Sequence, residues 1–470
     1  MESFGLRTLI SQVTLLAVSI FLTAVAWPAP DMSKVPAEMR KLPPAVLEWW
    51  IYEIYHPSQE ADLRYISVIN ENNQDPQYRP EAKTVFDLTG YWLPEEILEK
   101  FQSEVPSELK KLTQRINLRT GKPERLFFIH PESLDFYPEI VKDRTIETEI
   151  FKAIPSASSR GLLVWKVGAE HFPFVAKVSL NREIAGSPRI IPGFETHFSI
   201  EASKILAQIR LGEKISFMHE VVGLIPKGLK EGGEIFRVFN PEMLAGKMTV
   251  APLFALYGGS KKVKEGALLK KLIDESGLDP LDFARTKIIR PFAKVWIEFA
   301  LQGITMEPHA QNVLVALVNG EISHFEFRDF GGFDFAKEVR KALGLSLPAD
   351  PPNENLRDPG EFDVEYKKYA FKSIQRYFSA GFLYGLEGIY SQWRFKKVYA
   401  LKNLTRAWAR EMLAEELSAE LTRISGKKLS VREDLKDIAN KLEKTREAIM
   451  KKGGFVHATS CRRLYSQGSK

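Results

Sequence analysis

Three side chains that could do chemistry together stand in the second half of the chain: His309, Asn312 and Asp329. Carboxylate and amide oxygens are the ligands that Mg²⁺ takes when it is shared with nucleotide phosphates. A neutral imidazole can bond a phosphate, or the oxyanion that develops during acyl transfer. The three residue types therefore suit a magnesium nucleotide, provided that the fold returns Asp329 to the other two.

A β-hairpin is expected to bring these residues together. The pair Asn319-Gly320 separates two apolar segments, and Asn-Gly in this position is a strong hairpin signal because both turn residues take positive φ. An uninterrupted register places Asn312 opposite Phe327 and returns Asp329 to the start of the first strand, with opposed Cβ atoms roughly 5 Å apart. The alternative is that the polar residues only cap a buried hairpin, and then their loss harms folding more than ligand binding.

A second group of polar residues surrounds an upstream pair of predicted strands. Lys177 stands inside the second strand, from which an ammonium group can reach a phosphate as a point charge. Ser158 and Arg160 precede the first strand, and Arg189 follows the second. Guanidinium groups suit phosphate or carboxylate oxygens. Each of these residues alone also fits a solvated surface or an edge strand, so it is the set that indicates an anion site.

Together these motifs resemble the siderophore synthetases that work independently of nonribosomal peptide synthetases, the aerobactin-synthetase type. That family has a Ser-x-Arg pair, a Lys-x-Ser-Leu strand and a later arginine, then a Glu-x-His-x-Gln-Asn element and, past a strand pair, Arg-Asp. The matching residues here are Ser158, Arg160, Lys177, Arg189, Glu307, His309, Gln311, Asn312, Arg328 and Asp329. The resemblance covers about residues 125 to 335, and more loosely the region to about 408.

The resemblance implies an α+β, cupped-hand fold with ATP in a central β-sheet groove and a helical C-terminal region. It implies a ligase that adenylates a citrate-like carboxylate and lets an amine or hydroxyl displace AMP, with ATP and Mg²⁺ as cofactors, and association as homodimers. In this reading the catalytic residues are His309, Arg160 and Lys177, and the metal ligands are Asp329 and Asn312. The residues that bind ATP are Ser158, Arg160, Lys177, Arg189, Glu307, His309, Gln311, Asn312 and Asp329.

The sequence departs from this family at its front. The family carries a Gly-His-Pro-x-His-Pro-x-x-Lys element before its Ser-x-Arg pair, whereas His56-Pro57 stands isolated here. One alternative is therefore an exported, non-catalytic relative that binds an anionic ligand such as a siderophore.

Another alternative is a kinase-like phosphotransferase. Glu307 stands five residues before Asn312, and Asp329-Phe330-Gly331 follows, which parallels the Asp, Asn and Asp-Phe-Gly of protein kinases, with Lys177 as the strand lysine. The chain has no Gly-x-Gly-x-x-Gly loop before that lysine and no His-Arg-Asp. Release of AMP rather than ADP separates a ligase from a phosphotransferase.

The N-terminus bears on the compartment. Residues 9–27 form an uncharged, mostly apolar segment after Arg7, and Ala24-Val25-Ala26 suits a signal peptidase. An export signal is expected, or an inner-membrane anchor if the segment stays uncut. Lys34, Arg40 and Lys41 outnumber Arg7, so an uncut segment leaves the body on the cytoplasmic side.

Composition sets further bounds. The net charge is +6 and the pI about 9.0, but the basic residues are scattered among few aromatics, so nucleic acid is not an expected partner. Cys461 is the only cysteine, which excludes an intrachain disulfide or a cysteine zinc site.

Periodicity gives a coarse order of elements. Helices are expected over 35–55, 94–116 and 280–303, and strands with a helical end over 123–206. The expected regions are 1–27 (signal or anchor), 28–122 (helical or mixed), 123–347 (the nucleotide-binding core), 348–450 (helical) and 451–470 (a basic tail).

Overall fold

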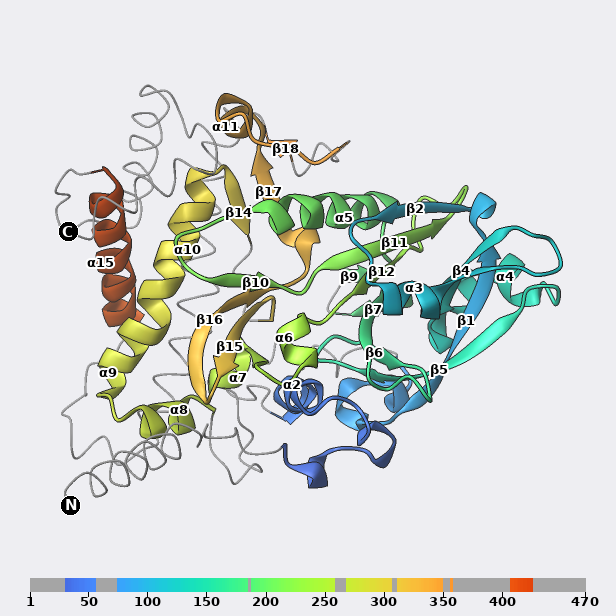
Figure 1. Ribbon diagram of the computed structural model, residues 1–470, viewed down its shortest axis with the longest axis horizontal. Coiled ribbons are helices and arrows are strands. Elements are labelled where there is room, and N and C mark those ends of the chain that lie inside the picture. Colours follow the sequence, from blue (N-terminus) through green and yellow to red (C-terminus); the bar gives the residue numbers. More distant parts are fainter. Residues whose placement is uncertain are drawn as a thin grey trace, which may run out of the picture.

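The computed structural model describes residues 30–55, 74–184, 187–257, 268–306, 311–349, 356–357 and 406–425. The predicted export segment, Cys461, His56-Pro57 and most of the predicted helical region 348–450 lie outside these residues. Within them the chain is a mixture of helices and strands, and the α+β prediction is confirmed (Figure 1). None of the described helices combines the length and the apolar character that a membrane span requires.

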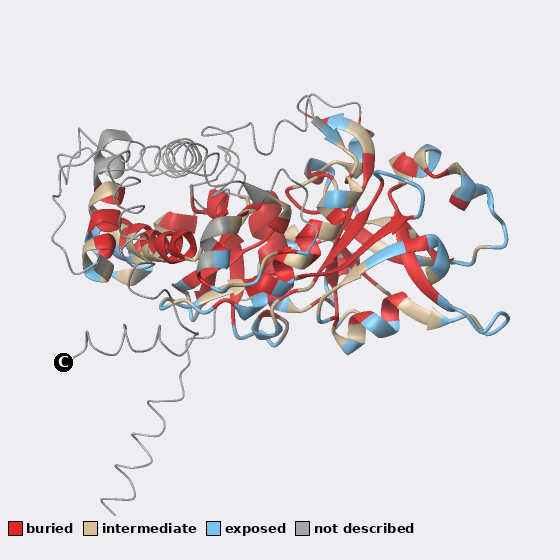
Figure 2. Cartoon of the chain, turned by 90° about the horizontal axis from the view of Figure 1, so that it is seen from above, coloured by how far each residue is buried: buried red, intermediate tan, exposed pale blue. Residues whose placement is uncertain are grey.

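A nine-stranded antiparallel sheet lies on the right of Figure 1. Its strands in spatial order are β2 (Leu98–Gln102), β11 (Glu220–Pro226), β12 (Glu234–Arg237), β7 (Phe174–Val178), β6 (Gly161–Trp165), β5 (Thr148–Pro155), β1 (Phe86–Pro94), β4 (Pro123–Ile129) and β3 (Gln114–Ile116). The predicted strand pair around Lys177 is confirmed as β6 and β7. The central strands of this sheet are buried along most of their length, as Figure 2 shows in red, and many of their buried residues are apolar.

The predicted helix over 94–116 is wrong. This segment contains β2, the short helix α3 (Ser107–Thr113) and β3. Leu98 and Phe101 lie in β2, which pairs with β11, and pairing with a distant strand overrides a helical pattern of this length. Because β3 pairs with β4, the sheet continues across the expected boundary between residues 122 and 123.

A four-stranded sheet carries the predicted hairpin. Its order is β10 (Ile215–Phe217), β16 (Glu321–Phe327), β15 (Val313–Val318) and β13 (Thr249–Pro252). Asn319 and Gly320 have φ of 51° and 85°, which confirms the predicted turn. The predicted register is wrong by one residue, because the ladder shifts between Ala316 and Leu317 and Val313 lies opposite Phe327. The extra residue of this β-bulge moves Asn312 opposite Arg328, whose N–H donates to the Asn312 carbonyl at 3.1 Å.

The remaining elements connect and cover the two sheets. The longer helices are α2 (Pro44–Tyr55), α5 (Gly193–Gln208), α8 (Leu268–Ser276), α10 (Arg290–Leu301) and α15 (Arg406–Ser425). The short helices are η1 (Met32–Lys34), η2 (Ala37–Met39), η5 (Pro76–Tyr78), η6 (Pro80–Ala82), η7 (Glu95–Ile97), η8 (Pro131–Phe136), α4 (Pro138–Lys142), α6 (Pro241–Leu244), α7 (Leu253–Tyr257), α9 (Pro280–Phe283), η9 (Ala284–Ile289), η10 (Phe330–Gly332) and α11 (Lys337–Ala342). The other strands are β8 (Leu180–Ile184), β9 (Ser187–Arg189), β14 (Ile304–Met306), β17 (Phe333–Ala336) and β18 (Leu356–Arg357). The predicted helix over 280–303 is confirmed as the run α9, η9 and α10, whose middle part is π-helical.

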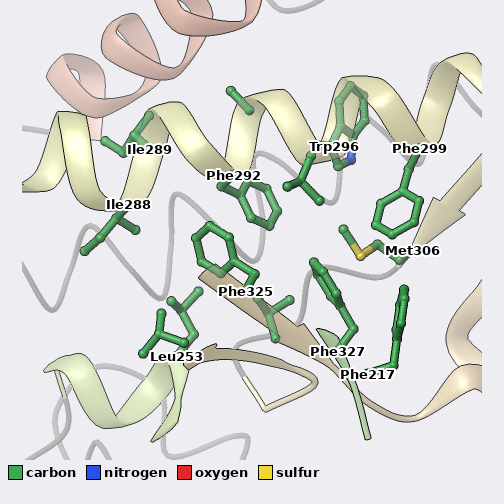
Figure 3. Packing of buried hydrophobic residues seen from close by; sticks show 14 of the residues in the cluster. Phe217, Leu253, Ile288, Ile289, Phe292, Trp296, Phe299, Met306, Phe325 and Phe327 are labelled. Carbon is green, nitrogen blue, oxygen red and sulfur yellow. The ribbon is translucent and has the colours of Figure 1, made fainter. Parts of the chain in front are cut away.

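Strand β16 divides its two faces between packing and polar chemistry. Phe325 and Phe327 pack edge-on against Phe292 and Phe299 of α10, with ring centroids 5.5 and 5.7 Å apart (Figure 3). Period 2 places His324, Glu326 and Arg328 on the opposite face. The phenylalanines thereby fix β16 against α10, and His324, Glu326 and Arg328 lie on the face of the strand that points away from this helix.

Helix α5 lies unusually close to β11. A Cβ atom built on Gly223 would lie 2.9 Å from the backbone oxygen of Thr196, which is closer than any side chain allows. Glycine at this position therefore lets the first turns of α5, including Glu195, approach the end of the sheet.

Buried Glu326 gives a testable pH dependence of stability. Burial raises its pKa from 4.5 to about 7, although Ser216 and the nearby amide of Asn240 favour the ionised form. Between about pH 4.5 and about pH 7 the folded state binds more protons at this carboxyl than the unfolded state does, so the free energy of unfolding falls as pH rises. One pKa unit is about 1.4 kcal/mol, so this carboxyl contributes up to about 3 kcal/mol to that fall.

The comparison that isolates this effect is wild type against Glu326→Gln in urea unfolding at about pH 5 and about pH 8. The wild type should lose more stability between the two pH values than the variant, by up to about 3 kcal/mol. An equal loss in both proteins would contradict the shifted pKa.

Candidate functional site

Seven of the predicted site residues line one pocket between the two sheets. They are Ser158, Arg160, Lys177, Arg189, Gln311, Asn312 and Asp329. Ser156, Gly161, Val175, Met218, Arg237 and Arg328 complete the lining. Glu307 and His309 lie outside the described residues, so their predicted roles stay predictions. The structure thus gathers residues that are up to 171 positions apart in the sequence, from 158 to 329.

The nine-stranded sheet supplies one wall of this pocket. Lys177 extends from β7, opposite Gly161 of β6. The tight turn between β5 and β6 presents Ser158 and Arg160, and it is closed by the hydrogen bond from the Ser156 N–H to the Gly161 carbonyl at 2.8 Å. The turn and strand β7 together therefore hold a hydroxyl, a guanidinium and an ammonium group at one side of the pocket.

Asp329 lies at the centre of an ion-pair cluster. The Lys177 ammonium donates to Asp329 Oδ1 at 2.6 Å and to Glu195 Oε1 at 2.7 Å. Arg237 Nη2 donates to the same Asp329 oxygen at 2.9 Å. Arg160 lies 3.8 Å from Glu195 Oε1. Two carboxylates and three cations thus share one site, and only 31% of the Asp329 side chain is exposed.

The backbone of Asp329 is strained, with φ of 65° and ψ of 68°. This left-handed conformation costs a residue other than glycine roughly 1 kcal/mol, and such residues cluster at functional sites. The ion pairs with Lys177 and Arg237 hold the carboxylate in place despite that cost. The strain is thus an independent sign that the position of this carboxylate matters.

Charge pairing controls the ionisation of the cluster. Burial opposes the ionised form of Asp329, but the charges of Lys177 and Arg237 outweigh it and hold its pKa well below the usual range. The pKa of Glu195 is likewise lowered, because Lys177 and Arg160 outweigh its burial. Both carboxylates are therefore charged at neutral pH, as a side chain that coordinates a metal cation must be.

Sequence reasoning missed three residues of this site: Glu195, Glu220 and Arg237. Arg237 Nε donates to Glu220 Oε1 at 2.6 Å, and Glu220 Oε2 accepts the Phe330 N–H at 3.3 Å. Burial disfavours the charge of Arg237, but Glu220 and Asp329 raise its pKa. The residues lie on strands β11 and β12 and on α5, and no spacing in the sequence relates them. The order of strands brings Glu220 and Arg237 to Asp329, and helix α5 brings Glu195 to Lys177.

Arg328 anchors the hairpin to the N-terminal helix. Its Nη1 donates to Glu53 Oε1 of α2 at 2.6 Å, and its Nε donates to the Gln311 carbonyl at 2.9 Å. Glu53 is fully buried, and its Oε2 accepts the Ala157 N–H at 3.1 Å. One carboxylate of α2 thus ties together the hairpin end and the turn that carries Ser158.

The size and charge of the pocket suit phosphate groups. Its volume is about 80 Å³, below the roughly 300–1,000 Å³ of a complete small-molecule site. Its lining contains five cationic side chains, of Lys177 and four arginines, against the single carboxylate of Asp329. Burial and the charge of Arg160 lower the pKa of Arg189, because a nearby positive charge disfavours the protonated guanidinium. The donor set therefore fits the anionic end of a larger ligand.

The described residues contain no group of three or more His, Cys, Asp and Glu side chains placed to hold a metal ion. Asp329 and Asn312 offer one carboxylate and one amide oxygen at the pocket. Mg²⁺ commonly takes only one or two protein carboxylates, together with substrate phosphates and water. These residues fit such a shared ion.

Comparisons with known proteins show which known folds this architecture resembles. Residues 295–373 match the family described as Ferric iron reductase FhuF-like transporter, a stretch that begins within α10 and includes the hairpin and Asp329. A search among curated proteins gave no match. The ATP-bound aerobactin synthetase IucA from Klebsiella pneumoniae is similar in structure, with a TM-score of 0.57 and 15% identity over 86% of this chain and 75% of that one.

This chain has the fold of the siderophore synthetases. Petrobactin biosynthesis protein AsbB from Bacillus anthracis is similar with a TM-score of 0.56 and 15% identity, over 79% of this chain and 67% of that one. Aerobactin synthetase IucC from Klebsiella pneumoniae gives a TM-score of 0.51 at 15% identity, over 80% and 66%. The predicted siderophore-synthetase-like fold is confirmed, and the polar pocket lies between the two sheets of that fold.

Proposed function

We propose that the chain is an ATP-dependent ligase of the siderophore-synthetase type, which joins a citrate-like carboxylic acid to an amine or hydroxyl. The observation that carries the proposal is the convergence of Ser158, Arg160, Lys177, Arg189, Asn312 and Asp329 on one cationic pocket. Their order in the sequence matches the family motif, and the fold that gathers them is the fold of the synthetases. In this proposal ATP activates the carboxylate and AMP leaves.

The proposed roles follow from charge and placement. Lys177, Arg160 and Arg189 would bind the phosphates, because an anionic carboxylate must approach an anionic triphosphate and several fixed cations lower that cost. Asp329 and Asn312 would hold Mg²⁺. Glu220 and Arg237 position Asp329, since Arg237 bonds both carboxylates.

The first experiment incubates residues 31–470 with Mg-ATP, a panel of citrate-like acids and a panel of amines, and identifies the nucleotide product. AMP that depends on the acid and on Asp329 supports the ligase. ADP instead supports the kinase-like phosphotransferase. Intact nucleotide with a folded protein supports an exported relative that binds an anionic ligand without catalysis.

Reduction of ferric iron, suggested by the description of the matched family, finds less support in the residues. An iron–sulfur cluster of the common type needs four cysteine thiolates, and this chain has one cysteine.

We also propose that residues 9–27 direct export or anchor the chain in a membrane; N-terminal sequencing of the protein from its native host would show whether the chain is cut after Ala26.

Replacement of Lys177 tests the phosphate role. Lys177→Met removes the charge but keeps a buried side chain of similar length. A hydrogen bond to a charged group is worth about 1.5–3 kcal/mol, so ATP affinity should fall roughly 30-fold while adenosine affinity changes less than about threefold. Calorimetric titration with both ligands measures the split; equal losses for both would contradict a phosphate contact.

A further inference from the structure

Glu195 is the carboxylate of the ion-pair cluster to which the proposed function gives no task. It lies in the first turn of α5, where the positive end of the helix dipole favours a negative side chain. Its Oε1 accepts a hydrogen bond from the Lys177 ammonium group at 2.7 Å and lies 3.8 Å from Arg160. Glu195 is not among the residues that line the polar pocket, so it acts on a bound phosphate through these two cations.

The backbone near Glu195 leaves room for this contact. A Cβ atom built on Gly331 would lie 3.2 Å from Glu195 Cγ, so glycine lets the turn after Asp329 pass directly beside the glutamate. Only 5% of the Lys177 side chain is exposed, against 21% of Glu195. A lysine this buried needs a compensating negative charge, and Glu195 supplies one from a helix that is packed against the sheet.

The Lys177 ammonium group is shared between two carboxylates. It donates to Asp329 Oδ1 at 2.6 Å and to Glu195 Oε1 at 2.7 Å. An ammonium group has three N–H donors. One donor therefore remains for a phosphate oxygen, provided that the lysine keeps its direction.

Binding of the proposed metal ion to Asp329 changes this balance. Lys177 and Arg237 both donate to Asp329 Oδ1, and Oδ2 accepts no hydrogen bond within the part of the chain that the structure describes. Once Asp329 holds a divalent cation, its carboxylate compensates Lys177 less, since the two cations repel each other. Glu195 is then the carboxylate that still holds the lysine.

Protein kinases arrange the same three charges. There the strand lysine pairs with a glutamate of a helix, and the aspartate of Asp-Phe-Gly holds Mg²⁺. Lys177 of β7, Glu195 of α5 and the segment Asp329-Phe330-Gly331 present that set here. The parallel concerns the placement of charge around phosphates, which ligases and phosphotransferases both need, and the nucleotide product separates those two reactions.

We propose that Glu195 is a positioning residue for ATP, which holds Lys177 toward the polar pocket while Asp329 binds the metal ion. The inference rests on the proposed ATP-dependent function and adds to it a residue from outside the family motif. The two carboxylates that share Lys177 thereby have different tasks, one toward the lysine and one toward the metal.

A positioning role and a purely electrostatic role of Glu195 predict opposite signs. If only its charge matters, any neutral replacement strengthens ATP binding, because a negative charge beside the phosphates is removed. If Glu195 positions Lys177, binding weakens when the acceptor oxygen is lost and is kept when an oxygen remains. Glu195→Leu removes the oxygen at similar size, whereas Glu195→Gln keeps an amide oxygen that can accept the Lys177 N–H.

Calorimetric titration of the whole chain with Mg-ATP and with adenosine measures the difference. Glu195→Leu should weaken Mg-ATP binding about tenfold and change adenosine binding less than about threefold. Glu195→Gln should stay within about threefold of wild type for both ligands. In the Lys177→Met background, Glu195→Leu should weaken Mg-ATP binding by less than about a further threefold, because the group that Glu195 positions is gone.

Glu201→Leu is the matched control, because Glu201 lies on the same helix and its carboxylate bonds Lys204 at 2.6 Å, away from the lining of the polar pocket. Its titrations should match those of wild type, and thermal unfolding shows that each variant is folded. Absence of Mg-ATP binding to wild type would overturn the ATP-dependent function together with this role. Binding to wild type, with unchanged or tighter binding in folded Glu195→Leu, would overturn the positioning role alone, as would an equal loss with and without Lys177.

Discussion

Asp329→Asn is expected to weaken Mg-dependent binding of ATP about 100-fold while the protein stays folded. Asparagine tolerates the left-handed backbone that Asp329 adopts, so the change removes the charge and little else. The lost carboxylate is the proposed metal ligand and the shared partner of Lys177 and Arg237. A 100-fold loss corresponds to about 2.7 kcal/mol, the size expected for removal of a charged group from a desolvated site.

The measurement is titration of ATP with and without Mg²⁺, for wild type and variant. Asp274→Asn is the control, because Asp274 is an exposed carboxylate on α8 that pairs with Lys270; its titration curves should match those of wild type. Unchanged Mg-dependent affinity in folded Asp329→Asn would remove the metal role from the proposed function.

Glu53→Ala should destabilise the protein by about 3–5 kcal/mol. Its carboxylate is the partner of buried Arg328 and also accepts the Ala157 N–H. Removal of one member of a buried ion pair leaves an uncompensated charge, and costs of this size follow. ATP affinity should fall as well, because the anchor of the turn that carries Ser158 and Arg160 is lost.

Urea unfolding at equilibrium measures the effect of Glu53→Ala. Glu38→Ala, at an exposed position of η2, should change stability by less than about 0.5 kcal/mol. The double variant Glu53→Ala with Arg328→Met should recover part of the loss, since it no longer buries a lone charge. A loss below about 1 kcal/mol in Glu53→Ala would show that water reaches and solvates Arg328.

The predictions that held rest on local geometry. Asn319-Gly320 forced the turn by its positive φ angles, and the alternation around Lys177 marked a strand that pairs with its neighbour. Those two local features were enough to predict that Lys177 and Asp329 belong to one site, given the motif order of a known family. The structure places the two groups 2.6 Å apart.

The sequence alone therefore determined the α+β class, the hairpin and seven of the residues that line the polar pocket, because turns and strands obey short-range sterics. Tertiary structure decided the rest. The bulge near Ala316 changed the register by one residue, since packing of Phe325 and Phe327 on α10 selects which side chains face inward. Strand order alone brought Glu220 and Arg237 to Asp329, because a sheet joins strands whose separation in the chain carries no signal.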